Sequence, residues 1–164
     1  SALEKNVESL RAALATNPAE ASAAAALEKA NGDLVRFRLE QAKAYVERYP
    51  NDYGARFTLA NLYFESGDYQ HAIANFQQAQ KNPKVRIAAL AGMGKSLKAR
   101  RMFDLAVAQF QSAKSELATM DDLKKEIIYE LADCFEAIGQ GEKASGTTML
   151  LATASAPAEA REAP

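Results

Sequence analysis

The sequence repeats itself at an interval of 34 residues, and this period limits the folds open to the chain more than any other feature. Under that shift, large apolar residues fall on large ones and small residues on small ones. The matched positions are Leu59 on Met93, Ala60 on Gly94, Tyr63 on Leu97, Tyr69 on Phe103, Ala72 on Ala106, Phe76 on Phe110 and Ala79 on Ala113. A period of this length indicates stacked copies of one small structural unit, each of which buries its apolar face against the next.

A third copy follows after a further shift of 38 residues. In this copy, Leu131, Ala132, Phe135, Gly139 and Ala144 correspond to Met93, Gly94, Leu97, Arg101 and Ala106. The four additional residues lie near the segment SELATMDD, and four residues make about one helical turn. We therefore expect the insertion to lengthen a helix while nearly keeping its buried face.

Each copy has the spacing of two helices joined by a turn. In residues 57–67, Leu59 and Leu62 lie at helical spacing before Gly67, because glycine easily takes the left-handed conformation past a helix end. Asp68 is the predicted N-cap of a second helix. The apolar face of that helix consists of Tyr69, Ala72, Ile73, Phe76 and Ala79. Valine, isoleucine and threonine nowhere alternate as they do in strands, so the sequence predicts an all-α protein.

This helix pair resembles the tetratricopeptide repeat, a helix–turn–helix unit of 34 residues. Residues 53–83 carry most of the signature and depart from it at Arg56, where tryptophan or leucine is usual. The second copy departs at Arg101, where glycine usually ends the first helix, and the third departs at Thr148, where an aromatic residue is usual. The resemblance covers residues 52 to about 152. It implies an all-α, right-handed α-solenoid of antiparallel helix pairs.

We divide the chain into a degenerate N-terminal helical repeat (1–50), three tetratricopeptide repeats (51–152) and a low-complexity tail (153–164). The three repeats are placed at about residues 52–84, 85–119 and 121–152. The tail is rich in alanine, proline and glutamate, and it lacks the apolar residues that would offset its ordering entropy.

Two helical stripes define the N-terminal part. The first consists of Leu3, Val7, Leu10 and Leu14, and the second of Val35, Leu39, Ala42, Val46 and Tyr49. Pro18, Pro50 and Pro83 mark places where helices stop. Asn31-Gly32-Asp33 is predicted to be the turn between the first two helices. The alternative is one long helix through Gly32, at a cost of about 1 kcal/mol relative to alanine.

Gly94-Lys95-Ser96 forms the last three letters of a phosphate-binding P-loop. The first glycine of that motif would have to be residue 89, which is alanine, and no buried strand precedes it. The repeat instead predicts that Gly94 lies inside a helix, opposite its partner helix. Gly92 has no such reason in the sequence, except that a bare backbone could let a ligand approach.

No catalytic or metal-binding set of residues emerges, so we expect neither an enzyme nor a cofactor. His71 is the only histidine and is interpreted as a solvated surface residue, since a lone histidine cannot make a typical zinc site. Cys134 lies in an apolar stretch and is interpreted as a buried, inert thiol. Asp121 and Asp122 suit a helix start, where the macrodipole favours negative charge.

The resemblance implies that the first helix of each pair lines a concave groove that holds a partner segment. The groove residues predicted on this basis are Phe57, Asn61, Phe64, Glu65, Ala91, Lys95, Lys98, Tyr129, Asp133 and Glu136. Such mixed charge with exposed aromatic residues suits a peptide with both apolar and charged side chains. An alternative is that Phe57 and Tyr129 pack against the adjoining repeat.

The groove matches the carboxylate-clamp subgroup of the family only in part. That subgroup uses lysine, asparagine and arginine to grip a partner's C-terminal carboxylate. Asn61, Lys95 and Lys98 fit this pattern, but Asp133 and Glu136 would repel a carboxylate.

A basic cluster, Lys95, Lys98, Arg100 and Arg101, has two interpretations. It is either what a helix C-terminus prefers electrostatically or part of a binding surface for an acidic group. The net charge of −1 argues against nucleic acid, and the longest apolar stretches are far shorter than the ~18 residues of a membrane span. A single cysteine excludes an internal disulfide and fits a reducing compartment, so a cytoplasmic location is expected.

Two functions follow as hypotheses. The first is a non-catalytic protein–protein interaction module that binds a partner peptide or segment in its groove. The alternative is a structural or self-assembly module of a larger protein, whose exposed first or last repeat packs against another copy or another domain, because solenoid ends without a polar cap tend to associate.

Overall fold

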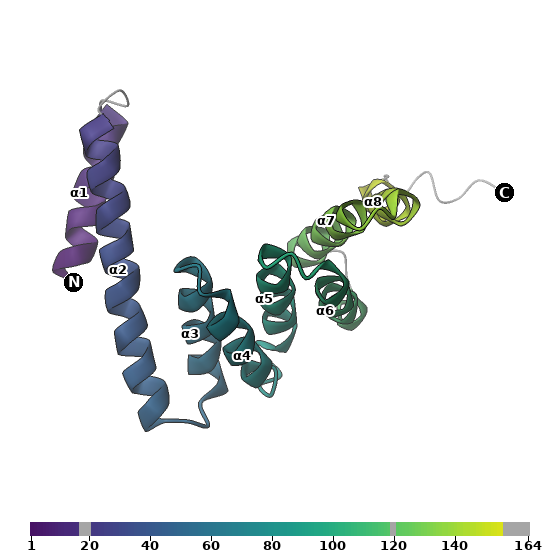
Figure 1. The fold of residues 1–164 in the computed structure, drawn as a ribbon, viewed down its shortest axis with the longest axis horizontal. Coiled ribbons are helices and arrows are strands. Elements are labelled where there is room, and N and C mark those ends of the chain that lie inside the picture. Colours follow the sequence, from purple (N-terminus) through teal and green to yellow (C-terminus); the bar gives the residue numbers. More distant parts are fainter. Residues whose placement is uncertain (17–20, 119–120, 156–164) are drawn as a thin grey trace.

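The computed structural model describes residues 1–16, 21–118 and 121–155, and these residues form eight helices and no strand. The helices are α1 (Ala2–Thr16), α2 (Ala21–Arg48), α3 (Tyr53–Glu65), α4 (Tyr69–Ala79), α5 (Arg86–Ala99), α6 (Phe103–Glu116), α7 (Asp122–Ala137) and α8 (Gly141–Ser155). Figure 1 shows them as successive pairs along an arc, with α3 and α5 on its inner side and α4 and α6 on its outer side.

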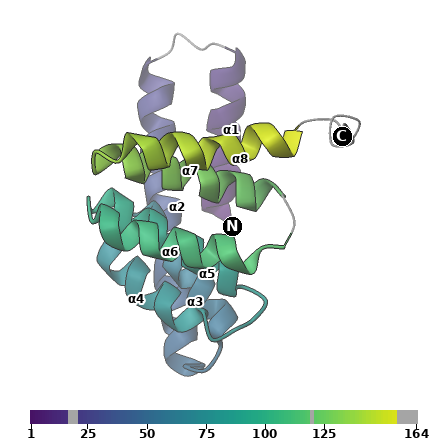
Figure 2. The same cartoon turned by 90° about the vertical axis from the view of Figure 1, so that its right-hand side faces the viewer.

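Each helix packs against the next one along the chain, and α5 also touches both α3 and α7. Figure 2 shows the same pairs stacked one above another, with the α1/α2 hairpin running across the stack. Stacking in which each unit touches only its neighbours is the defining property of a solenoid. The predicted all-α solenoid of helix pairs is therefore confirmed.

The insertion in the third copy lengthens the helices on both sides of it, as expected. Helix α6 has 14 residues where α4 has 11, and α7 has 16 where α5 has 14. At the other end, α8 runs to Ser155, so the first residues of the segment predicted as a tail are helical. Residues 156–164 lie outside the described part, and the division into domains stays a prediction.

Small residues lie where paired helices approach each other, and large ones fill the space beside them. Ala60, Ala72 and Ala106 are fully buried, and Ala144 is 3% exposed. The rings of Phe76 and Phe110 are buried against them. The matched slots of the repeat thus form two core clusters that both contact Met93, and their close-packed side chains leave little room for a change of volume.

Two glycines in α5 are needed because phenylalanine rings pack against their bare backbone. A Cβ atom on Gly94 would lie 2.7 Å from Cε1 of Phe110, and one on Gly92 would lie 2.5 Å from Cζ of Phe76. The helical placement of Gly94 is confirmed. The glycine at position 92 has a packing reason that the sequence did not reveal, since it admits the ring of the preceding pair.

The first helix of each repeat ends in the same hydrogen-bonded turn. Residues 67, 101 and 139 have φ values of 81°, 61° and 76°, and Arg101 is the only residue other than glycine with positive φ in the described part. After each of them, a backbone N–H donates to a carbonyl five residues earlier, as Met102 does to Leu97 at 2.9 Å. This is the Schellman motif. Arg101 adopts a conformation that costs a non-glycine residue roughly 1 kcal/mol.

The second helices of the first two repeats differ in their caps. The Asp68 carboxylate accepts a hydrogen bond from the His71 N–H at 3.2 Å and caps α4 as predicted. In α6 the equivalent residue is Met102, which has no capping side chain. The backbone is nearly the same at both places, with φ and ψ of −84° and 70° at Asp68 and −91° and 62° at Met102.

Met102→Asp is therefore expected to raise the free energy of unfolding by about 1 kcal/mol, the usual value of an N-cap. The new carboxylate meets a backbone already in the capping conformation, and Met102 is 37% exposed, so little packing is lost. Urea denaturation followed by circular dichroism measures the change. Asp68→Ala is the matched control and should lose a similar amount; a Met102→Asp variant with unchanged stability contradicts the prediction.

The turn predicted at Asn31-Gly32-Asp33 is wrong, because α2 continues without interruption from Ala21 to Arg48. Ala30 and Leu34, on either side of the glycine, are buried against Val7 of α1. A turn there would expose this cluster, and its burial outweighs the roughly 1 kcal/mol cost of a helical glycine. Helices α1 and α2 instead pack against each other, and residues 17–20 between them, which include Pro18, lie outside the described part.

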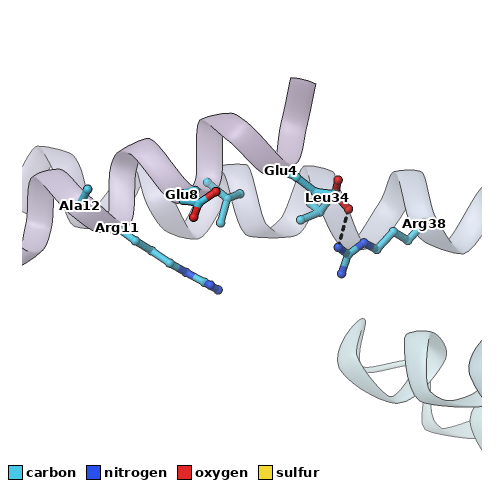
Figure 3. A pocket seen from close by; sticks show the side chains of 7 residues that line it. Glu4, Glu8, Arg11, Ala12, Leu34 and Arg38 are labelled. Atoms are coloured by element: carbon cyan, nitrogen blue, oxygen red, sulfur yellow. Dashed lines mark hydrogen bonds and ion pairs between the residues drawn. The ribbon is translucent and has the colours of Figure 1, made fainter. Parts of the chain in front are cut away.

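An ion pair holds the other end of α1 against α2. Arg38 of α2 donates to the Glu4 carboxylate at 2.7 Å. Figure 3 shows this pair at one end of a shallow hollow between the two helices, with Glu8 and Arg11 along its rim.

Among the described helices, none is long and apolar enough to cross a membrane.

Candidate partner-binding groove

The inner side of the arc carries a small hollow with a largely aromatic lining, here called the apolar hollow. Helix α3 contributes Phe57, Asn61 and Phe64 to it. Its other lining residues are Phe76 from α4, Ala88, Ala91, Gly92 and Lys95 from α5, and Leu123 from α7. Its volume is about 220 Å³, and Asn61 and Lys95 are its only polar side chains. Sites of this composition are typical of pockets that bury an apolar group and orient it with a few polar ones.

A second, more open hollow adjoins the first and shares Phe64 and Lys95 with it, so we call it the charged hollow. It is lined also by Lys98 and Ala99 of α5, by Phe103 of α6 and by Glu130 of α7, with a volume of about 500 Å³. The two hollows together form one groove that follows α3, α5 and α7. The sequence analysis predicted that a partner segment binds on this side.

All three phenylalanines that line the apolar hollow contact another ring. The ring centroids of Phe57 and Phe76 are 5.7 Å apart, and those of Phe64 and Tyr69 are 5.4 Å apart. Phe57 therefore both packs against the second helix of its own pair and lines the groove. This ring contact lies within its own repeat and is not the packing against the adjoining repeat weighed as the alternative, so the groove role of Phe57 stays a prediction.

The lysines of the groove are held by carboxylates of α7. Lys95 forms an ion pair with Glu126, and Nζ of Lys98 lies 2.7 Å from Glu130 and 2.9 Å from Asp133. Partial burial lowers the pKa of Lys98, but its hydrogen bonds to these two carboxylates outweigh that effect and raise it. Lys98 therefore stays charged at neutral pH and ties α5 to α7 across the groove.

These ion pairs change the interpretation of the basic cluster. Lys95 and Lys98 are engaged by acidic side chains, whereas Arg100 and Arg101 are exposed at the end of α5. The four residues do not present a single free cationic patch. These ion pairs also weaken the partial match to a carboxylate clamp, because a partner's carboxylate would have to displace Glu130 and Asp133 from Lys98.

The structure gathers six of the ten predicted groove residues around the two hollows: Phe57, Asn61, Phe64, Ala91, Lys95 and Lys98. Asp133 joins them through its ion pair with Lys98. Glu65, Tyr129 and Glu136 are exposed and line neither hollow, with Tyr129 at 59% exposure. Most of the Tyr129 side chain is therefore open to solvent, and its role stays a prediction.

Sequence reasoning missed several residues that shape the groove. Phe76 and Phe103 come from second helices, whose side chains the repeat pattern assigns to the core. Glu126 and Glu130 of α7 were also missed, although they pair with the lysines of the groove. Glu126 and Glu130 are four residues apart on α7, and Lys95 and Lys98 are three residues apart on α5; this helical spacing was the available signal.

The remaining candidates behave as structural groups. His71 is exposed, lies 2.7 Å from the Asp68 carboxylate and stacks on Tyr63 with a centroid distance of 5.0 Å. Cys134 is fully buried, and burial raises the pKa of its thiol to about 11. A thiol that stays protonated is a poor nucleophile. Asp121 caps α7 by accepting from the Lys124 N–H at 2.8 Å. Among the residues with described positions, no acidic, histidine and cysteine side chains group as metal ligands.

Solved structures with this arrangement of helices are known. A crystal structure of MamA aligns with a TM-score of 0.62 and 17% identity, covering 88% of this chain and 84% of that one. A Podosopora anserina kinesin light chain with nearly identical TPR-like repeats aligns with a TM-score of 0.61 and 19% identity, covering 93% and 86%. No family model and no curated protein matches the sequence. The chain therefore has the tetratricopeptide-repeat fold, as the 34-residue period predicted.

Proposed function

We propose that this chain is a non-catalytic protein-interaction module that holds a peptide or segment of another protein in the groove along α3, α5 and α7. The observation that carries the proposal is the apolar hollow between Phe57, Phe64 and Phe76, which opens on the inner side of the solenoid. Extended concave surfaces of this kind are the usual binding surfaces of helical-repeat proteins. Of the remaining predicted contacts, Asp133 pairs with Lys98, and Glu65, Tyr129 and Glu136 are exposed side chains of α3 and α7.

The polar groups beside the hollow suit a polypeptide ligand. The Asn61 side chain makes no hydrogen bond within the described residues, so its amide can donate to and accept from a partner's main chain. Phe64 separates the apolar hollow from the charged one, and a bound segment could therefore place an apolar side chain in one and a polar side chain in the other. Alternating use of such sites is a common way to gain specificity from a short segment.

A tryptophan at position 88 tests the proposal by filling the apolar hollow. Ala88 is a half-buried lining residue of α5, so Ala88→Trp places an indole where the partner's side chain would lie. Peptides enriched from a random display library on the unmodified protein serve as probes, with affinity measured by fluorescence anisotropy. We expect Ala88→Trp to weaken their binding at least about tenfold, the equivalent of 1.4 kcal/mol.

Ala74→Trp is the matched control, because it makes the same substitution on the exposed face of α4. It should leave peptide affinity unchanged, while circular dichroism confirms that both variants are folded. Equal binding to the two tryptophan variants, or failure to enrich any peptide that depends on position 88, contradicts the proposal.

Self-assembly is the second candidate, and exposed apolar residues near both ends of the solenoid favour it. Met149 and Leu150 of α8 are 67% and 42% exposed, and Tyr45 of α2 and Tyr49, which directly follows α2, are both 48% exposed. Terminal units without a polar outer face tend to associate. Light scattering over a range of concentrations tests this alternative: a particle that stays monomeric at high concentration removes it.

A further inference from the structure

The ionic groups of the groove are unequal in number. Two lysines, Lys95 and Lys98, face three carboxylates, those of Glu126, Glu130 and Asp133. The side chains of Glu126 and Asp133 remain 48% and 61% exposed after pairing, so each can still accept hydrogen bonds from a ligand. The groove therefore has a negative excess next to its apolar hollow.

The same face of α7 continues this negative character. Glu136 follows Asp133 by three residues and is exposed. Tyr129 precedes Asp133 by four residues, and its ring is exposed to solvent. The basic residues of α7 do not balance these charges, because Lys124 donates to the Leu117 carbonyl and Lys125 pairs with Asp122, both near the start of the helix. Lys143 of α8 lies over the Phe135 ring.

We propose that the partner segment is basic, with an apolar side chain for the apolar hollow and lysine or arginine side chains for the acidic face of α7. This inference rests on the proposed function and names the chemistry of its ligand. The carboxylates of Asp133 and Glu136 bind the cationic groups. A guanidinium stacks on the exposed ring of Tyr129, which lies between Glu126 and Asp133 on the helix surface.

Charge complementarity decides between this partner and an acidic one. An acidic segment, or a free C-terminal carboxylate, would meet the negative excess and would have to displace Glu130 and Asp133 from Lys98 before it gained an ion pair. A basic segment leaves these ion pairs intact and pairs with carboxylate oxygens that are still exposed. Complementary charges also favour encounter and exclude like-charged competitors.

The test uses the peptides selected on the unmodified protein. We expect them to be enriched in lysine and arginine and to contain an apolar residue. Their affinity should fall about tenfold on Asp133→Asn combined with Glu136→Gln, and likewise when the basic residues of the peptide are replaced by glutamine. Raising the ionic strength should weaken binding, whereas amidation of the peptide C-terminus should change nothing.

The control variant Glu28→Gln combined with Asp104→Asn removes the same two charges from exposed positions on α2 and α6. It should bind as the unmodified protein does, which separates a local contact from the effect of net charge. Selected peptides that are neutral or acidic, or that bind the Asp133→Asn, Glu136→Gln variant normally, overturn this inference. If such peptides still lose affinity on Ala88→Trp, the groove stands and only its charge preference is wrong; if they do not, the proposed function fails as well.

Discussion

Replacing Phe110 with alanine is expected to lower the free energy of unfolding by about 3–5 kcal/mol. Phe110 is fully buried in α6, where its ring lies against Gly94 of α5 and belongs to the cluster shared by α5, α6 and α7. Truncation loses the transfer free energy of the ring and leaves a cavity at the centre of the solenoid. Urea denaturation followed by circular dichroism provides the measurement.

Phe37→Ala is a matched control for this substitution. Phe37 lies on α2 and is 46% exposed, so its truncation should cost well under about 1 kcal/mol, as is usual for surface positions. Comparable losses in the two variants would show that Phe110 does not have the central packing role assigned to it.

A methyl group added at Gly94 should destabilise the protein even though it favours the helix. Alanine gains about 1 kcal/mol in helix propensity over glycine. Against this, a Cβ atom 2.7 Å from the Phe110 ring overpacks the core, which costs about 1–3 kcal/mol. The net result of Gly94→Ala is an expected loss of up to about 2 kcal/mol, measured by the same denaturation experiment.

Two further variants isolate the cause. In a Phe110→Leu background the ring is absent, so Gly94→Ala should lose its penalty, and the two substitutions should be strongly non-additive. Gly32→Ala, in the exposed middle of α2, has no atom within 4 Å of the added methyl group and should stabilise the protein by about 1 kcal/mol. If Gly94→Ala stabilises as Gly32→Ala does, the proposed contact with Phe110 is wrong.

The repeat made most of the fold predictable, because the same physical requirement recurs at each copy. Ala72, Ala106 and Ala144 must all be small where helices cross, and the turn at residues 67, 101 and 139 needs a left-handed residue in each copy. Arg101 was recognised as a departure from glycine, and it nevertheless adopts the left-handed conformation. The hydrogen bonds and packing of the surrounding turn therefore outweigh the local preference of the side chain.

The N-terminal part was harder to predict because it has no second copy for comparison. Asn31-Gly32 is a strong turn signal by composition, but Ala30 and Leu34 are held against Val7 of α1 by long-range packing. No local pattern reports which helix a stripe faces.

The repeat predicted which helices carry the two hollows but not the ion pairs beside them, and partner binding there stays a prediction. The repeat places Asn61, Lys95 and Asp133 at equivalent positions, which locates the inner face. The repeat does not predict that Lys95 and Lys98 form ion pairs with Glu126, Glu130 and Asp133, because these pairs join neighbouring repeats rather than residues of one repeat. The sign of the net charge in the groove therefore depends on the packing of α5 against α7, which the repeat pattern alone does not give.

The unbroken course of α2 has a mechanical consequence. Its 28 residues span about 42 Å as a helix, with α1 along the first half and α3 along the second. Since a hydrogen-bonded helix is stiff, a force applied to the α1 end of α2 is transmitted along the helix to α3. A molecule bound to the α1/α2 hairpin therefore exerts force on α3, the first helix of the groove, without contacting it.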